Sequence, residues 1–259
     1  MPALPNSFKV SLIEERLQIG LWMALANAYT AEVCAGAGYD WLLIDGEHAP
    51  NDIPSILAQL QAVGRTSSHA IVRPPIGEAW LIKQILDLGA QTILVPMVES
   101  GEQARDLVKA VRYPPHGVRG IGAGLARASS FNRDKDYLQT ANDEICLLVQ
   151  IESRAGIEAL EDIARTDGVD GVFIGPADLA ADMGFLGRPD LPEVVEVVIA
   201  AIGRLKSLGK PAGLLTADRI LAQRYVEAGA SFVAIGSDVG LLATQSTALL
   251  QGFQQATNT

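Results

Sequence analysis

Several residue types are scarce in this chain of 259 residues, and each shortage excludes a class of protein. The only cysteines, Cys34 and Cys146, lack the spacing of a metal or redox site, so we expect reduced thiols and a cytoplasmic location. No apolar run approaches the ~18 residues that a membrane span needs, and no signal peptide is visible in residues 1–14. The net charge of -10, without any basic run, predicts that neither nucleic acid nor an anionic membrane is a partner.

The chain also lacks a lysine placed for covalent carbonyl chemistry. Every lysine lies in a terminus, a predicted helix or a loop, and Lys210 precedes a predicted strand at the end away from a ligand. None can therefore form a Schiff base with a substrate bound at the carboxyl ends of the strands. If this protein forms an enolate, a metal ion must accept the developing charge.

What the chain does contain is a regular alternation of short apolar runs and amphipathic segments. Between the runs lie helical patterns such as Ile53, Leu57 and Leu60, with Pro54 in the first turn and Gly64 at the end. Eight strands are predicted, over residues 19–23, 41–45, 70–73, 92–96, 145–151, 171–174, 212–215 and 232–235. They predict an α/β fold, a single (βα)8 TIM barrel over residues 1–259. A doubly wound open sheet is the competing fold, but it usually has fewer strands before a domain break.

One segment, residues 113–137, interrupts this alternation with prolines, glycines and arginines. It follows a helix and precedes a strand, so it belongs to the end of the barrel opposite the ligand. A loop of this length is uncommon without a function, and we expect it to pack against another subunit. Its glycines, residues 120–124, do not form a dinucleotide fingerprint, because no strand precedes them and Leu125 occupies the third glycine position.

The most informative segment is the predicted strand that starts at Trp41 and ends at Asp45, followed directly by Glu47 and His48. Carboxyl ends of strands face the ligand in α/β folds. Histidine is scarce, with three in the whole chain, so one beside two carboxylates indicates a functional site. The alternative is that the carboxylates cap the next helix and the histidine is a solvated loop residue.

Other strands deliver charged side chains to the same end. Arg73 ends an apolar strand, and it needs an anionic partner, either a substrate or a neighbouring carboxylate. Gln150 and Glu152 end a later strand, and Asp178 follows the next one, 26 residues beyond Glu152. Paired carboxylates without histidine or thiolate favour a hard cation that keeps several waters. The alternative is that Glu152 and Asp178 are favourable first-turn anions of helices.

These residues form motifs that resemble a known family, HpcH/HpaI aldolase, over about residues 8–250. The matching segments are Gly20-Leu21-Trp22, residues 40–50, Tyr113-Pro114-Pro115 with Arg119-Gly120, Gln150-Ile151-Glu152-Ser153 and Gly175-Pro176-Ala177-Asp178. The resemblance implies a (βα)8 barrel and a metal-dependent class II pyruvate aldolase of aromatic catabolism. It also implies a homo-oligomer, a hexamer in which the carboxy-terminal helix is exchanged between subunits.

The resemblance further implies roles for single residues. Glu152 and Asp178 would bind Mg²⁺, Mn²⁺ or Co²⁺, and the backbone N–H groups of Ala177 and Asp178 would hold the carboxylate of the 2-oxo acid. Gln150 would contact the substrate, and Arg73 would stabilise the enolate oxygen. His48 would be the general base, acting through a water on the metal. We expect Asp45 and Glu47 to contact these catalytic residues and not the substrate.

The resemblance also implies that Asp87 raises the basicity of His48. Asp87 lies near the end of a predicted helix, however, and that end faces away from the barrel's own ligand side. Either this helix is shorter than predicted, or Asp87 acts in the site of a neighbouring subunit. We expect the second arrangement.

The predicted reaction is reversible aldol cleavage of a 4-hydroxy-2-oxo acid into pyruvate or hydroxypyruvate and an aldehyde. The sequence leaves open which aldehyde, donor and metal are used. One alternative is a phosphate-binding barrel isomerase or epimerase, with Gly213 and Gly236-Ser237 as its phosphate cradle. Another is a 2-oxo acid binding protein without catalysis, which would not need a base.

Overall fold

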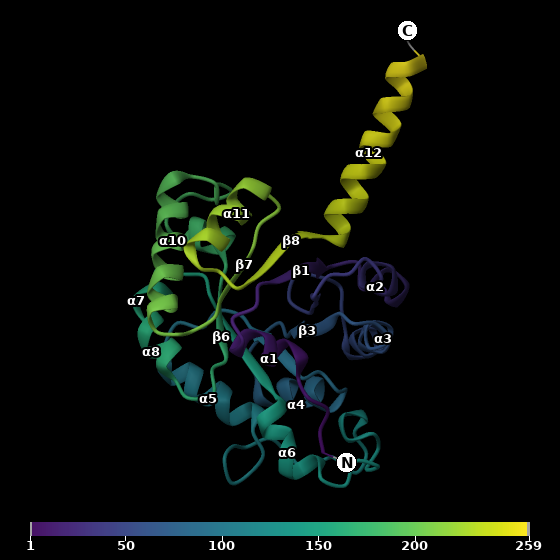
Figure 1. The fold of residues 1–259 in the computed structure, drawn as a ribbon, viewed down its shortest axis with the longest axis vertical. Helices are drawn as coiled ribbons and strands as arrows, with labels where there is room; N and C mark the ends of the chain where they lie inside the picture. The colour runs from purple at the N-terminus through teal and green to yellow at the C-terminus, as the bar shows by residue number, and fades with distance from the viewer. Residues whose placement is uncertain (1, 258–259) are drawn as a thin grey trace.

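Eight parallel strands close into a barrel, in sequence order, in the computed structural model, which describes residues 2–257 (Figure 1). The strands are β1 (Gln18–Met23), β2 (Trp41–Asp45), β3 (His69–Arg73), β4 (Thr92–Val95), β5 (Cys146–Ile151), β6 (Gly171–Ile174), β7 (Ala212–Leu215) and β8 (Phe232–Ser237). Each coincides with a predicted strand, apart from one or two residues at its ends. The predicted (βα)8 barrel is confirmed.

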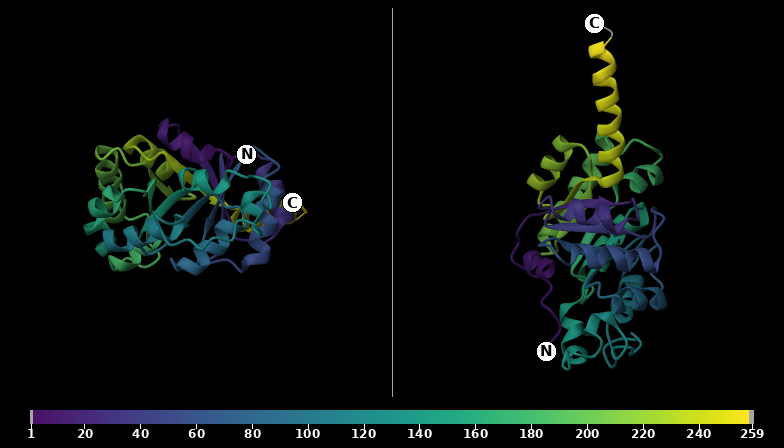
Figure 2. Two further views of the ribbon diagram at one scale, coloured as in Figure 1. Left: turned by 90° about the horizontal axis from the view of Figure 1, so that it is seen from below. Right: turned by 90° about the vertical axis from the view of Figure 1, so that its right-hand side faces the viewer.

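Helices surround the barrel, as the two further views show (Figure 2). Local sequence determines where they begin and end. Asp52 caps the start of α3 by accepting the N–H of Ser55, and Gly89, just after the end of α4, has a φ of 97°, which glycine adopts readily. The helices are α1 (Ser7–Ile13), α2 (Ala28–Ala35), α3 (Ile53–Val63), α4 (Ala79–Asp87), α5 (Gly101–Val111), the 3₁₀ turn η1 (Arg127–Ser129), α6 (Tyr137–Glu144), α7 (Arg154–Glu158), α8 (Leu160–Arg165), α9 (Pro176–Asp182), α10 (Pro192–Ser207), α11 (Arg219–Ala228) and α12 (Asp238–Thr257).

Large aromatic rings fill the inside of the barrel. Trp41, Phe173 and Phe232 pack there with Phe8 of α1, and all are buried. Two glycines provide the room, because a Cβ on Gly20 would lie 2.2 Å from the Trp41 ring and one on Gly213 would lie 2.1 Å from the Phe232 ring. Gly213 is therefore required for core packing. This gives no support to the alternative in which it cradles a phosphate.

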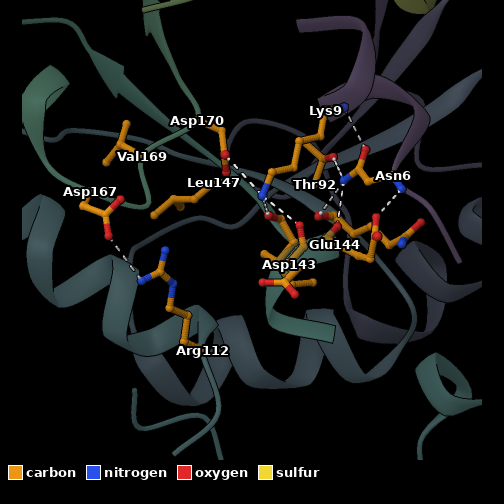
Figure 3. A network of polar contacts seen from close by, with 12 residues as sticks. Asn6, Lys9, Thr92, Arg112, Asp143, Glu144, Leu147, Asp167, Val169 and Asp170 are labelled. Atoms are coloured by element: carbon orange, nitrogen blue, oxygen red, sulfur yellow. Dashed lines mark hydrogen bonds and ion pairs between the residues drawn. The ribbon is translucent and has the colours of Figure 1, made fainter. Parts of the chain in front are cut away.

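A polar network joins α1 to the amino-terminal ends of the strands (Figure 3). Lys9 forms an ion pair with Asp170 at 3.3 Å and donates to the carbonyl oxygens of Asp143 and Ile145. Asn6 donates to the Thr92 hydroxyl at 3.0 Å, and Asp170 accepts the N–H of Leu147. The polar groups at this end of the barrel are therefore bonded to one another. A ligand would bind at the opposite end, where the strands have their carboxyl ends.

Two segments leave the compact barrel. The loop of residues 113–137 lies against α4, where Arg127 donates to the Leu88 carbonyl at 2.8 Å, and it exposes Ile121 and Leu125. The last helix, α12, runs outward from the end of β8 (Figures 1 and 2). Asp238 is its only buried residue among those described. Its packing on another subunit stays a prediction. No helix within residues 2–257 is long and apolar enough to cross a membrane.

Candidate active site

A cavity of about 620 Å³ opens at the carboxyl ends of the strands. It brings together most of the residues that the sequence singled out. They come from strands or from the loops that follow them, and the predicted residues that line the cavity are Asp45, His48, Arg73, Gln150, Ala177 and Asp178. Trp22 of β1, Phe173 of β6 and Leu215 of β7 provide apolar walls. Six of the predicted residues therefore lie together at the expected end of the barrel, whereas Glu47, Asp87 and Glu152 do not line this cavity.

Arg73 is held in one orientation by carboxylates. Asp45 and Arg73 are direct partners in the register of β2 and β3, so their side chains meet at the same height. The Arg73 Nε and Nη2 donate to the two oxygens of Asp45 at 2.9 and 2.7 Å, and Nη1 lies 2.7 Å from Glu47 Oε2. Asp45 and Arg73 are buried. The neighbouring carboxylate that the sequence left as an alternative partner of Arg73 is present, and the guanidinium also faces the cavity.

The pKa values of these carboxylates differ because their surroundings differ. Burial alone would raise the pKa of Asp45, but the hydrogen bonds and charge of Arg73 outweigh it and lower that pKa. Burial raises the pKa of Glu47, and the charge of Arg73 only partly opposes the rise. Asp45 is thus the ionised partner that orients Arg73.

Trp22 is a functional residue whose role the sequence did not predict. Its indole N–H donates to Asp45 Oδ2 at 3.1 Å, and the Arg73 guanidinium carbon lies 4.9 Å from its ring centre. The ring therefore covers one face of the arginine while its nitrogen fixes the carboxylate behind it. The signal in the sequence was the motif Gly20-Leu21-Trp22, in which an aromatic residue lies two positions after a glycine inside a strand.

Glu152 is buried and is oriented from two sides. Its Oε1 accepts the backbone N–H of Met97 at 2.9 Å, and Oε2 accepts the amide of Gln150. Met97 has a φ of 56°, an uncommon value for a residue other than glycine. A Cβ on Gly175 would lie 2.6 Å from Glu152 Oε2, so this glycine provides the space for the carboxylate. The carboxylate is therefore positioned before any ligand arrives.

The charges around the cavity fit a divalent cation. Asp45 and Glu47 share Arg73, whereas no cation of residues 2–257 pairs with Glu152 or Asp178. Burial raises the pKa of Glu152, and the negative charges of Asp178 and Glu47 add to the rise. The buried Gln150 Oε1 also lacks a hydrogen-bond partner. A dication beside Glu152 and Asp178 would compensate this excess of negative charge.

The described residues do not provide the ligand set of a structural zinc site. The described part of the chain contains no group of three or more histidine, cysteine, aspartate and glutamate side chains able to hold a metal ion. A structural zinc site would need such a group, whereas Mg²⁺ is commonly bound through one or two carboxylates, with the rest of its ligands from water and substrate.

His48 lies in the loop after β2, at the edge of the cavity. Its side chain is 68% exposed, and its Nε2 lies 3.9 Å from Glu47 Oε2. Its backbone N–H points to Asp45 Oδ1 at 3.4 Å, so the loop is tied to the carboxylate that holds Arg73. The imidazole is accessible to a substrate in the cavity, and Glu47 is the acidic group of residues 2–257 that lies within 4 Å of it.

Asp87 does not lie in this cavity. Helix α4 continues through Asp87, so the explanation that this helix is shorter than predicted is wrong. The carboxylate instead forms an ion pair with Arg119 at 2.8 Å, beside the loop of residues 113–137. Within one chain it therefore does not line the cavity with His48, and its action in the site of a neighbouring subunit stays a prediction.

Comparison with known proteins supports the same assignment as the geometry. The HpcH/HpaI aldolase/citrate lyase family matches residues 18–244, which contain the whole barrel. The chain belongs to this family. Membership confirms the expected enzyme class, an aldolase that breaks a carbon–carbon bond and acts on small molecules.

Individual members of the family are similar along nearly the whole chain. A hydroxypyruvate/pyruvate aldolase of Deinococcus radiodurans is 58% identical, over 97% of this chain and 91% of its own. A 4-hydroxy-2-oxo-heptane-1,7-dioate aldolase of Escherichia coli is 54% identical, over 96% and 95%. The crystal structure of an HpcH/HpaI aldolase/citrate lyase family protein from Burkholderia cenocepacia has a TM-score of 0.93 and 39% identity, and covers 96% of this chain and 99% of its own.

Proposed function

We propose that this aldolase catalyses the reversible cleavage of a 4-hydroxy-2-oxo acid into an aldehyde and pyruvate or hydroxypyruvate, with a divalent metal ion. The observation that carries the proposal is a cavity that contains a fixed guanidinium and Asp178, with Glu152 directly behind it through its contact with Gln150; neither carboxylate is paired with a cation of residues 2–257. The guanidinium can stabilise an enolate oxygen, and the two carboxylates can hold the metal. The names of the two relatives agree with this substrate class.

Glu152 and Asp178 would hold Mg²⁺, Mn²⁺ or Co²⁺, which, when bound, would withdraw charge from the oxygens of the 2-oxo acid. Ala177 and Asp178 belong to the first turn of α9, where backbone N–H groups have no acceptor within the helix. They would bind the substrate carboxylate there. The free Oε1 of Gln150 would accept a hydrogen bond from the substrate.

Arg73 would stabilise the enolate. A guanidinium has five N–H bonds, and the contacts to Asp45 and Glu47 leave hydrogens on Nη1 and Nη2 for a substrate oxygen. Because Asp45 and Trp22 fix its plane, little reorganisation is needed when charge develops on that oxygen.

His48 would move the proton at C3 of the donor. In cleavage, a base removes the proton of the 4-hydroxyl group, the C3–C4 bond breaks, the aldehyde leaves and the pyruvate enolate takes up a proton. In condensation, His48 removes a proton from C3 of pyruvate or hydroxypyruvate, and the enolate attacks the aldehyde. Its exposure at the edge of the cavity suits such a transfer.

We also propose that the assembly is a hexamer with α12 exchanged between subunits. Leu242, Leu249 and Phe253 are exposed on this helix, which supports packing on another copy. In such an assembly Asp87 of one subunit would approach His48 of the next and raise its basicity.

The first experiment follows hydrogen–deuterium exchange at C3 of pyruvate and of hydroxypyruvate by NMR. We expect exchange with Mg²⁺ or Mn²⁺, none with EDTA, and recovery when metal is returned. The variant Glu152→Gln should slow the exchange at least about 100-fold and remove its dependence on metal, because it removes one of the two carboxylates proposed to bind the metal. Failure of both donors to exchange, with metal bound, would favour a binding protein without catalysis.

A further inference from the structure

Arg119 is a buried cation that the proposed mechanism does not use. Its side chain is fully buried, and its guanidinium carbon lies 4.4 Å from the centre of the Tyr113 ring. Its Nη2 donates to Asp87 Oδ1 at 2.8 Å, and no partner within residues 2–257 accepts from its Nε or Nη1. Burying a guanidinium with unpaired N–H groups is costly, so a fold that needed only packing would favour an apolar residue here.

The other carboxylate oxygen of Asp87 stays accessible. The side chain is 25% exposed, and a Cβ built on Gly122 would lie 3.5 Å from Oδ2. A longer side chain at residue 122 would therefore cover this oxygen. Arg119 holds Oδ1 from inside the protein, whereas Gly122 has no side chain that could cover Oδ2 of this partly exposed carboxylate.

We propose that Arg119 is a positioning residue, which fixes the Asp87 carboxylate so that its free oxygen faces a second copy of this chain. This inference rests on the proposed function, in which Asp87 acts on His48 of a neighbouring subunit. The apolar side chains that the same loop exposes, Ile121 and Leu125, are 68% and 90% accessible in one chain and would be covered by that copy.

A double-mutant cycle on the intact oligomer tests the proposal, with C3 proton exchange of pyruvate as the readout. Arg119→Met should lower the exchange rate about 10- to 100-fold, as loss of an outer partner of an active-site group usually does. In the Asp87→Asn background the same change should have less than about a threefold further effect, because Arg119 acts only through Asp87. Arg119→Lys should restore part of the rate.

Arg127 supplies the matched control. It comes from the same loop and anchors it to the same end of α4, through the Leu88 carbonyl, without contacting Asp87. Arg127→Met should keep the exchange rate within about threefold, and any loss should be additive with Asp87→Asn. If Arg119→Met prevents folding, Arg119→Lys takes its place in the cycle. Gly122→Leu, which would cover Asp87 Oδ2, then tests the open oxygen, with Gly124→Leu as its control, since no atom lies within 4 Å of a Cβ at Gly124.

The outcomes separate this inference from the proposed function. A wild-type rate for Arg119→Met, or equal losses with and without Asp87→Asn, would overturn the role of Arg119. A wild-type rate for Asp87→Asn would remove Asp87, and Arg119 with it, from the mechanism. In either case metal-dependent exchange by the wild type would leave the proposed aldolase reaction standing.

Discussion

Replacing Asp45 with asparagine tests the central electrostatic feature of the site. The carboxylate accepts two hydrogen bonds from Arg73, one from the indole of Trp22, and two from backbone N–H groups, those of Glu47 at 3.0 Å and His48 at 3.4 Å. Asparagine has nearly the same shape but no charge, and one of its two terminal atoms is a donor that would face the donors of Arg73 or Trp22.

The expected loss of folding stability is about 2 to 4 kcal/mol. Removing one partner of a buried ion pair costs about 3 to 5 kcal/mol, because the other charge stays buried. The loss expected here is about 1 kcal/mol smaller, since Arg73 keeps its contact of 2.7 Å to Glu47. Enolate formation should also slow, because the guanidinium is no longer held in one plane.

The assay is urea unfolding at neutral pH and one fixed protein concentration, since association contributes to stability. With a slope of about 3 kcal/mol/M, the midpoint should fall by about 1 M. Asp190→Asn is the control: Asp190 pairs with Arg188 at 3.2 Å, but both side chains are more than half exposed. That pair should contribute less than about 1 kcal/mol. Equal midpoints for the two variants would refute the reasoning.

Three further predictions concern the assembly and the stability of the fold. Mixed oligomers of His48→Ala and Asp87→Ala subunits should recover about a quarter of the active sites if the two residues act across an interface, and none if they act within one chain. Phe253→Asp should reduce the size of the oligomer in sedimentation, whereas Gln251→Asp on the same exposed helix should not. Burial lowers the pKa of His69 to about 4. Since the unfolded chain takes up this proton near pH 6.5, stability should fall by up to about 3 kcal/mol between about pH 6.5 and 4. A His69→Gln variant that kept the same pH dependence of its urea midpoint would contradict this assignment.

Several features of this protein follow from the sequence by itself. Each strand is built around a short apolar run, so the order, the number and nearly the bounds of the strands could be predicted. The same runs identify the ends of the strands, and Arg73, Glu152 and Asp178 could be assigned to one end of the barrel. This succeeds because strand formation and direction are determined by local patterns.

Other features depended on the tertiary structure. Asp45 faces Arg73 because of the register between β2 and β3. The N–H of Met97, in the segment after β4, donates to Glu152, which directly follows the neighbouring strand β5. The ion pair of Asp87 with Arg119 joins the end of α4 to a loop that lies 32 residues further along the chain. Such contacts are determined by how distant segments pack in space. The spacing of apolar residues along the chain predicts strands and helices, but it does not predict which distant side chains will meet.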